Sequence, residues 1–131
     1  MDYSGLIRAA TEARGSAHSP YSGFAVGAAL LCEDGSIFTG CNVENLSFGL
    51  TMCAERVALG SAVAAGNRKF RCIAIAADTD EVLSPCGACR QVLAEFNPAL
   101  TVYAANLNGK VEEFSLEVLL PRASKGILNR S

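Results

Sequence analysis

Hydrophobic and polar residues follow two different periods along this chain, one typical of helices and the other of strands. Apolar residues three and four positions apart predict an amphipathic first helix over residues 2–17. The same spacing predicts a second helix over residues 51–65, which a Gly-Asn pair terminates. A third helix is predicted over residues 84–96, with Ser84 as its N-cap and Pro85 as its first helical residue.

Short apolar runs between these helices predict strands. They cover residues 25–32, 36–40, 72–77, 100–105 and 111–114. An Asp-Gly pair and an Asn-Gly pair suit the tight turns of antiparallel neighbours, and Ser115 begins a final short helix. This order of elements predicts an α/β fold, a three-layer α/β/α sandwich with a five-stranded mixed sheet. No repeat or linker divides the sequence, so we expect residues 1–131 to form a single domain.

Composition narrows the expected partners and the compartment. The net charge is −2 and the basic residues are scattered, which argues against binding nucleic acid. No run approaches the roughly 20 apolar residues of a membrane span, and the N-terminus lacks the basic-then-apolar order of a signal peptide. We therefore expect a cytoplasmic protein with no membrane partner. Thiols stay reduced in the cytoplasm, so the six cysteines are interpreted as metal ligands and as buried thiols, the latter being Cys32, Cys41 and Cys72.

Three cysteines and a glutamate form the clearest candidate site. Cys53 stands two residues before Glu55, and Cys86 and Cys89 follow later, spaced to share one face of the third predicted helix. Three thiolates can hold Zn²⁺ and leave a fourth tetrahedral position open, as in catalytic zinc sites. A CxxC pair alone would also suit a redox pair or buried cysteines. With Cys53 and Glu55 upstream, the catalytic zinc site is the favoured interpretation.

Four blocks of this sequence resemble the small zinc-dependent cytidine deaminases, in the same order and spacing. They are residues 21–30, 40–45, 53–56 and 85–91. The resemblance extends from about Tyr21 to Pro121. It implies an α/β/α fold, one Zn²⁺ per subunit and hydrolytic deamination of cytidine and 2′-deoxycytidine in pyrimidine salvage. It also implies a homotetramer whose sites lie near subunit interfaces.

Glu55 and two arginines have expected roles beside the metal. Glu55 is expected to be the catalytic residue that takes a proton from water and delivers it to the ring N3 and then to the amine. Three thiolates leave the zinc site negative, so we expect Arg56 and Arg90 to hydrogen-bond the sulfurs and withdraw charge. The alternative for either arginine is an ion pair at the surface.

Four further residues are candidates for binding the substrate. By resemblance, Phe24 stacks on the pyrimidine, Asn42 and Glu44 bind the ribose 3′-hydroxyl, and Ala54 offers backbone groups to the base. Asn42 and Glu44 are two residues apart, so in an extended chain their side chains face the same way. The alternatives are core packing for Phe24 and ordinary turn polarity for the other pair.

Two departures from the family leave the substrate open. Ser124 stands where these deaminases usually carry a phenylalanine that reaches a neighbouring subunit's site, and Phe48 replaces a more usual tyrosine. Weaker binding of cytidine, or tolerance of a bulkier cytosine compound, follows as a hypothesis. The alternative functions are a deaminase of a cytosine antibiotic such as blasticidin S and a non-catalytic zinc module that binds RNA or protein.

Overall fold

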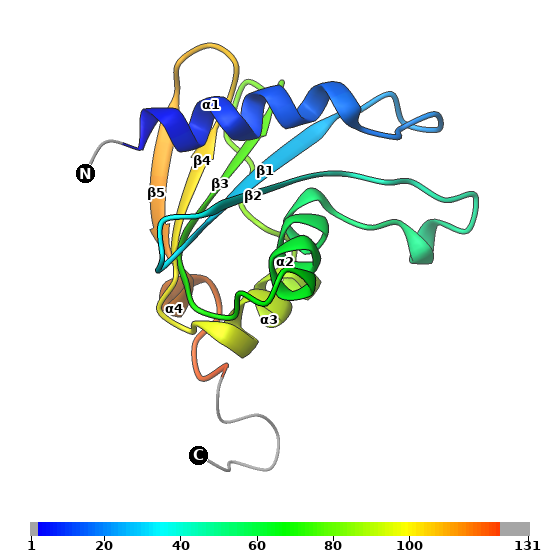
Figure 1. The fold of residues 1–131 in the computed structure, drawn as a ribbon. Coiled ribbons are helices and arrows are strands. Elements are labelled where there is room, and N and C mark those ends of the chain that lie inside the picture. Colours follow the sequence, from blue (N-terminus) through cyan, green and yellow to red (C-terminus); the bar gives the residue numbers. More distant parts are fainter. Residues whose placement is uncertain (1–2, 124–131) are drawn as a thin grey trace.

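The computed structural model describes residues 3–123, and one mixed sheet is its central layer (Figure 1). Its five strands are β1 (Val26–Cys32), β2 (Ile37–Cys41), β3 (Phe70–Ala77), β4 (Thr101–Ala105) and β5 (Val111–Ser115). The strand order is β2-β1-β3-β4-β5, in which β3 and β4 are parallel and every other pair is antiparallel. The five-stranded mixed sheet expected from the sequence is therefore confirmed.

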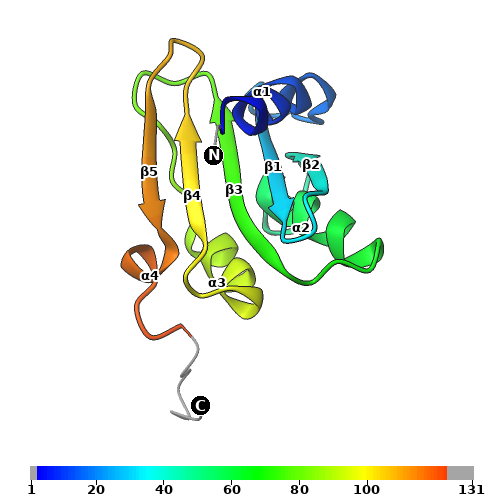
Figure 2. The same cartoon turned by 60° about the vertical axis from the view of Figure 1, so that its left-hand side comes forward.

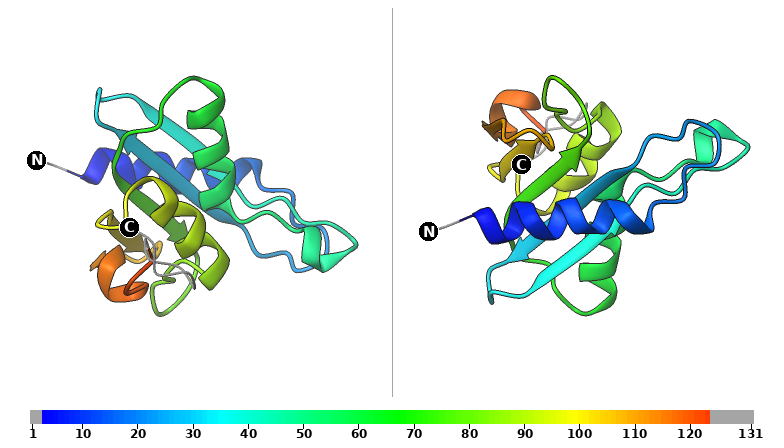
Figure 3. Two further views of the ribbon diagram at one scale, coloured as in Figure 1. Left: turned by 90° about the horizontal axis from the view of Figure 1, so that it is seen from below. Right: turned by 90° about the horizontal axis from the view of Figure 1, so that it is seen from above.

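Helices cover both faces of this sheet. They are α1 (Ser4–Ala13), α2 (Ala54–Ala64), α3 (Gly87–Phe96) and α4 (Leu116–Leu119), with short 3₁₀ turns η1 (Arg14–Ser16) and η2 (Phe48–Leu50). Helix α1 lies on one face, and α2 and α3 lie side by side on the other (Figures 2 and 3). This arrangement confirms the three-layer α/β/α sandwich. None of the helices in the described residues is long and apolar enough to cross a membrane.

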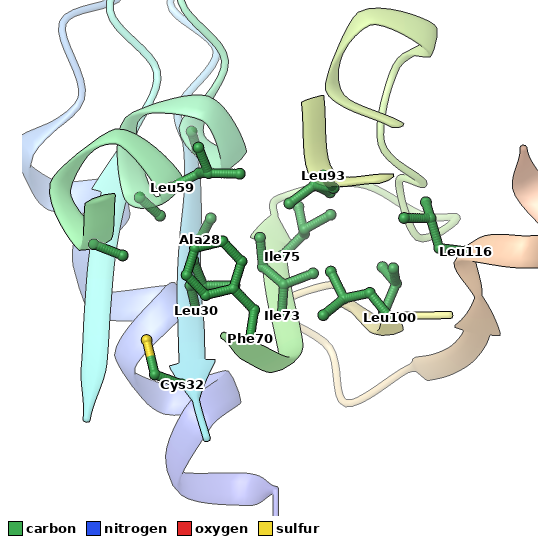
Figure 4. Close-up of a cluster of buried hydrophobic side chains, with 14 of the residues drawn as sticks. Ala28, Leu30, Cys32, Leu59, Phe70, Ile73, Ile75, Leu93, Leu100 and Leu116 are labelled. Atoms are coloured by element: carbon green, nitrogen blue, oxygen red, sulfur yellow. The ribbon is translucent and has the colours of Figure 1, made fainter. Parts of the chain in front are cut away.

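The strands bury side chains on both faces, which is why they appear in the sequence as continuous apolar runs. In β1, Ala28 and Leu30 point toward α2 and α3, whereas Ala29 and Leu31 point toward α1. The larger cluster fills the α2 and α3 side of the sheet around Phe70 (Figure 4). These two layers of apolar contacts fix the start of α2 and of α3 over the same part of the sheet.

Two glycines let helices approach the sheet at backbone distance. A methyl group on Gly40 would lie 2.4 Å from both the Ala54 carbonyl oxygen and the Ala58 nitrogen of α2. On the opposite face, a methyl group on Gly27 would lie 1.9 Å from the Ala10 carbonyl oxygen of α1. Any side chain at Gly40 would therefore displace the first turn of α2.

Helix starts differ from the sequence prediction. Helix α2 begins at Ala54, because residue 53 is its extended N-cap. Helix α3 begins at Gly87, with Cys86 rather than Ser84 as its N-cap. The Cys86 sulfur accepts a hydrogen bond from the Cys89 backbone N–H and so takes the capping position. Two candidate zinc ligands are therefore helix N-caps, Cys53 in α2 and Cys86 in α3.

Candidate active site

The three candidate ligand sulfurs lie together at the N-termini of α2 and α3. Their Sγ atoms are all within 4.8 Å of one another, with 3.8 Å between Cys53 and Cys86 and 3.4 Å between Cys86 and Cys89. Tetrahedral zinc with Zn–S bonds of about 2.3 Å separates its sulfur ligands by roughly 3.8 Å. The residues present therefore fit a zinc ion bound by three thiolates.

The surroundings of the sulfurs favour one thiolate even before metal binds. A hydrogen bond with the Cys89 thiol, reinforced by one from Arg56, lowers the pKa of Cys53 to about 5. The same hydrogen bond, together with burial, raises the pKa of Cys89. The N-terminal ends of two helices add a positive partial charge at the sulfurs. Metal binding would then release the protons that remain.

Arg56 contacts the sulfur cluster directly. One of its terminal nitrogens donates to the Cys53 Sγ at 3.8 Å and to the Thr51 carbonyl oxygen at 3.0 Å. Its Nε is buried and has no hydrogen-bond partner within residues 3–123. A guanidinium held this way lies where it can balance the negative charge of the thiolates.

Arg90 does not make the contact that we expected. Its guanidinium donates to the Pro85 carbonyl oxygen at 2.7 Å, the Leu119 carbonyl oxygen at 3.0 Å and the Ser84 Oγ at 3.1 Å. Its hydrogen bonds therefore run to the loop before Cys86 and to the end of α4, and none of them is to a sulfur. The expected hydrogen bond from Arg90 to a sulfur is not seen within residues 3–123, and its side chain instead joins α3 to this loop and to the end of α4.

Glu55 lies in the first turn of α2 and is only 5% exposed. Burial raises the pKa of its carboxyl group. It lines a pocket of about 240 Å³. The other lining residues are Phe24, Val26, Asn42, Thr51, Cys53, Ala54, Ile75, Leu83, Ser84 and Cys86. A buried acid therefore faces the same pocket as two of the candidate ligands.

Asn42 lines this pocket, whereas Glu44 lines the hollow next to it, and Thr51 lines both. Asn42 is buried, where its amide accepts from the Val26 N–H and donates to the Phe24 carbonyl. Glu44 lies in a neighbouring hollow, where its carboxylate accepts from the Tyr21 and Ser22 N–H groups and from the Ser22 hydroxyl. Both side chains hydrogen-bond to the segment of residues 21–26, and Val43 between them makes bridges to His18 and Met52.

Sequence reasoning missed part of the pocket wall. Thr51 lines both hollows, and Leu83 and Ser84 form the wall beside Cys86. The position of Leu83 and Ser84 just before the Pro-Cys pair was a usable signal. No sequence signal showed that Ile75 lines the pocket, because it cannot be told apart from the other apolar residues of a buried strand. Ser124 lies outside the described residues.

Residues 2–105 match the family described as "Cytidine and deoxycytidylate deaminase zinc-binding region". The chain belongs to this family. It is 52% identical over 124 residues to the cytidine deaminase of Sporosarcina psychrophila, covering 94% of this chain and 91% of that protein. The cytidine deaminase of Halalkalibacterium halodurans is 53% identical over 124 residues, which are 94% of each chain. The crystal structure of the Burkholderia pseudomallei cytidine deaminase superposes with a TM-score of 0.90 at 51% identity, covering 93% of this chain and 98% of that one.

Proposed function

We propose that this protein is a zinc-dependent enzyme that converts cytidine and 2′-deoxycytidine to uridine and 2′-deoxyuridine in pyrimidine salvage. The observation that carries the proposal is the cluster of three sulfurs, two of which line the same pocket as the buried Glu55. Its relatives with about half of their residues identical are named cytidine deaminases. Neither the antibiotic deaminase nor the non-catalytic zinc module is favoured by these relatives.

Cys53, Cys86 and Cys89 hold one zinc ion per subunit in this proposal. When bound, the ion supplies a Lewis acid that makes water nucleophilic near neutral pH. Arg56 offsets the negative charge of the thiolates through its hydrogen bond to the Cys53 sulfur.

Glu55 carries the protons of the reaction. It takes one proton from the attacking water and delivers it to N3 of the cytosine ring, and it then transfers the second proton to the C4 amine. The C4–N bond breaks and ammonia leaves, so one cytidine and one water give one uridine and one ammonia. The raised pKa that burial gives the carboxyl group suits a residue that must hold a proton between these steps.

The pocket wall binds the nucleoside. Phe24 stacks on the pyrimidine, and the Ala54 backbone contacts the base. Asn42 and Glu44 bind the ribose 3′-hydroxyl, which requires Glu44 to exchange its hydrogen bond with the Ser22 hydroxyl for one with the sugar. The carboxylate also repels a 3′- or nearby phosphate, which favours a nucleoside over a nucleotide as substrate.

Residues 42–52 favour a homotetramer with active sites near subunit interfaces. Leu46, Phe48 and Leu50 are 77%, 72% and 67% exposed, and Phe48 lines the hollow next to the active pocket. Clustered exposed apolar side chains are typical of protein contacts. We place the enzyme in the cytoplasm, where its ligand thiols stay reduced.

A substrate panel tests the proposal. Zinc-loaded protein is mixed with cytidine, 2′-deoxycytidine and blasticidin S in parallel, and the ultraviolet change on deamination is followed. Turnover of both nucleosides supports the proposal. Turnover of the antibiotic alone, or of none of the three, contradicts it.

A further inference from the structure

The loop that carries the pocket wall and leads into Cys86 has few attachments of its own. Residues 82–85 belong to no helix or strand, and Cys86 is the most exposed of the three candidate ligands. Within the described residues, the hydrogen bonds recorded for residues 82–85 are both donated by Arg90, to Ser84 Oγ and to the Pro85 carbonyl. Besides the burial of Pro85, the side-chain hydrogen bonds that hold this loop therefore come from one residue of α3.

Arg90 joins three parts of the chain. Its backbone N–H donates to the Cys86 carbonyl at 2.9 Å, which continues the helix, while its Nε and one terminal nitrogen bind the preceding loop. The other terminal nitrogen donates to the Leu119 carbonyl at 3.0 Å, at the end of α4. A planar guanidinium presents five donors in a fixed fork, so it can bind three divergent oxygens at once, whereas a lysine ammonium cannot match that geometry.

We propose that Arg90 is a positioning residue that keeps Cys86 in place for zinc and keeps Leu83 and Ser84 at the pocket wall. The inference rests on the three-thiolate zinc site of the proposed function. All three acceptors are uncharged oxygens of the backbone and of a hydroxyl, so the hydrogen bonds of Arg90 fix the position of the loop. Removing its donors frees the loop, and a mobile Cys86 releases zinc faster.

The test measures zinc release into a chromogenic chelator from zinc-loaded protein, in the absence of substrate. Arg90→Met keeps the length of the side chain and removes its donors, and we expect release at least about tenfold faster, because partners that orient metal ligands typically change affinity about 10–100-fold. Arg90→Lys keeps one donor and is expected to lie between Arg90→Met and the parent.

Asn97→Ala is the matched control at the other end of α3. Asn97 donates to the Phe70 carbonyl at 2.8 Å and accepts from the Ala99 N–H, so this variant also loses side-chain hydrogen bonds to backbone. It lies far along the helix from the sulfurs. We expect a lower melting temperature of the zinc-free protein with an unchanged rate of zinc release, which separates positioning of Cys86 from general loss of stability.

Ser84→Ala and the double variant complete the test. Ser84→Ala removes one of the three acceptors, so we expect a smaller acceleration, and none when it is added to Arg90→Met. Parent-like zinc release in Arg90→Met, or equal acceleration in Asn97→Ala, overturns the inference. If Arg90→Met does not fold, parent-like release in both Arg90→Lys and Ser84→Ala overturns it. A parent protein that binds no zinc overturns the zinc site and this inference together, whereas a zinc-binding parent without deaminase activity overturns only the proposed function.

Discussion

Glu55 combines two properties that conflict in an ordinary side chain, burial and the ability to ionise. It is the one acidic residue among the described residues that is buried, and burial raises the pKa of its carboxyl group. A carboxyl group in water would give up its proton too readily to return it to a leaving amine. The pocket therefore gives this glutamate a chemical character that the exposed glutamates of the chain lack.

Glu55→Gln is expected to lower kcat by about 10²–10⁴-fold, because the amide cannot take a proton from water. The zinc content should stay at one ion per subunit, since Glu55 is not among the three ligands. Steady-state kinetics and metal analysis check both points. Glu12→Gln, which changes an exposed glutamate of α1, is the control and should retain parent activity.

The cysteines should divide into two reactivity classes. Cys32 and Cys72 are buried, and burial raises the pKa of the Cys72 thiol to about 11. Cys86 is exposed and Cys53 is half-buried, so iodoacetamide should modify both after zinc is removed by a chelator, and neither while zinc is bound. Peptide mass spectrometry reads out the sites. Modification of Cys72 as fast as Cys86 in folded protein would contradict this division.

The helices and strands were predictable because local signals and tertiary packing agree at most of them. The β1–β2 and β4–β5 hairpins follow from their Asp-Gly and Asn-Gly turns, and the five strands lie where apolar runs predicted them. The start of α3 was not predictable from capping preferences, because the N-cap is Cys86, whose sulfur accepts from the Cys89 N–H, and not Ser84. The hydrogen bonds of Asn42 and Glu44 were not predictable either, because their partners, residues 21–26, are distant in sequence.

At the level of elements, the contact between β2 and α2 positions the chemistry. Gly40→Ala places a methyl group 2.4 Å from two backbone atoms of α2, the helix that carries Cys53 and Glu55. We expect it to destabilise the fold by about 1–3 kcal/mol, to speed zinc release and to lower kcat. Thermal unfolding, chelator competition and kinetics measure these three effects.

Gly27→Ala is the matched control for Gly40→Ala. It creates an even closer contact, 1.9 Å from the Ala10 carbonyl oxygen, but against α1, which carries none of the candidate site residues. It should lower stability while zinc release stays at the parent rate. Equal effects of both variants on zinc would show that the approach of α2 to β2 has no special importance for the site.

On the scale of the whole molecule, the active pocket lies beside an apolar surface that residues 3–123 leave uncovered. Residues 17–25 and 42–52 run side by side, joined by hydrogen bonds between His18 and the second segment, and project beyond the sheet (Figure 3). The second segment carries the exposed Leu46, Phe48 and Leu50. Because Phe48 lines the hollow that holds Glu44, a subunit that covers this surface would also contact the hollow that we propose binds the ribose.

Leu46→Ser combined with Leu50→Ser is expected to shift the assembly toward smaller species at micromolar concentration and to raise KM more than it lowers kcat. Sedimentation velocity and steady-state kinetics measure the two effects. Ile37→Ser is the control, since Ile37 is an exposed apolar residue at the opposite end of the β1–β2 hairpin from this surface. A parent protein that sediments as a monomer at all concentrations would contradict the tetramer.

The dependence of cytidine turnover on zinc tests the central claim most directly. Zinc is removed with a chelator and restored in steps, and uridine and ammonia are quantified against bound metal. We predict no turnover without zinc, activity that rises in proportion to zinc up to one ion per subunit, and equal amounts of the two products. Fully loaded protein that forms no uridine, or turnover that is unaffected when zinc is removed, would contradict the account.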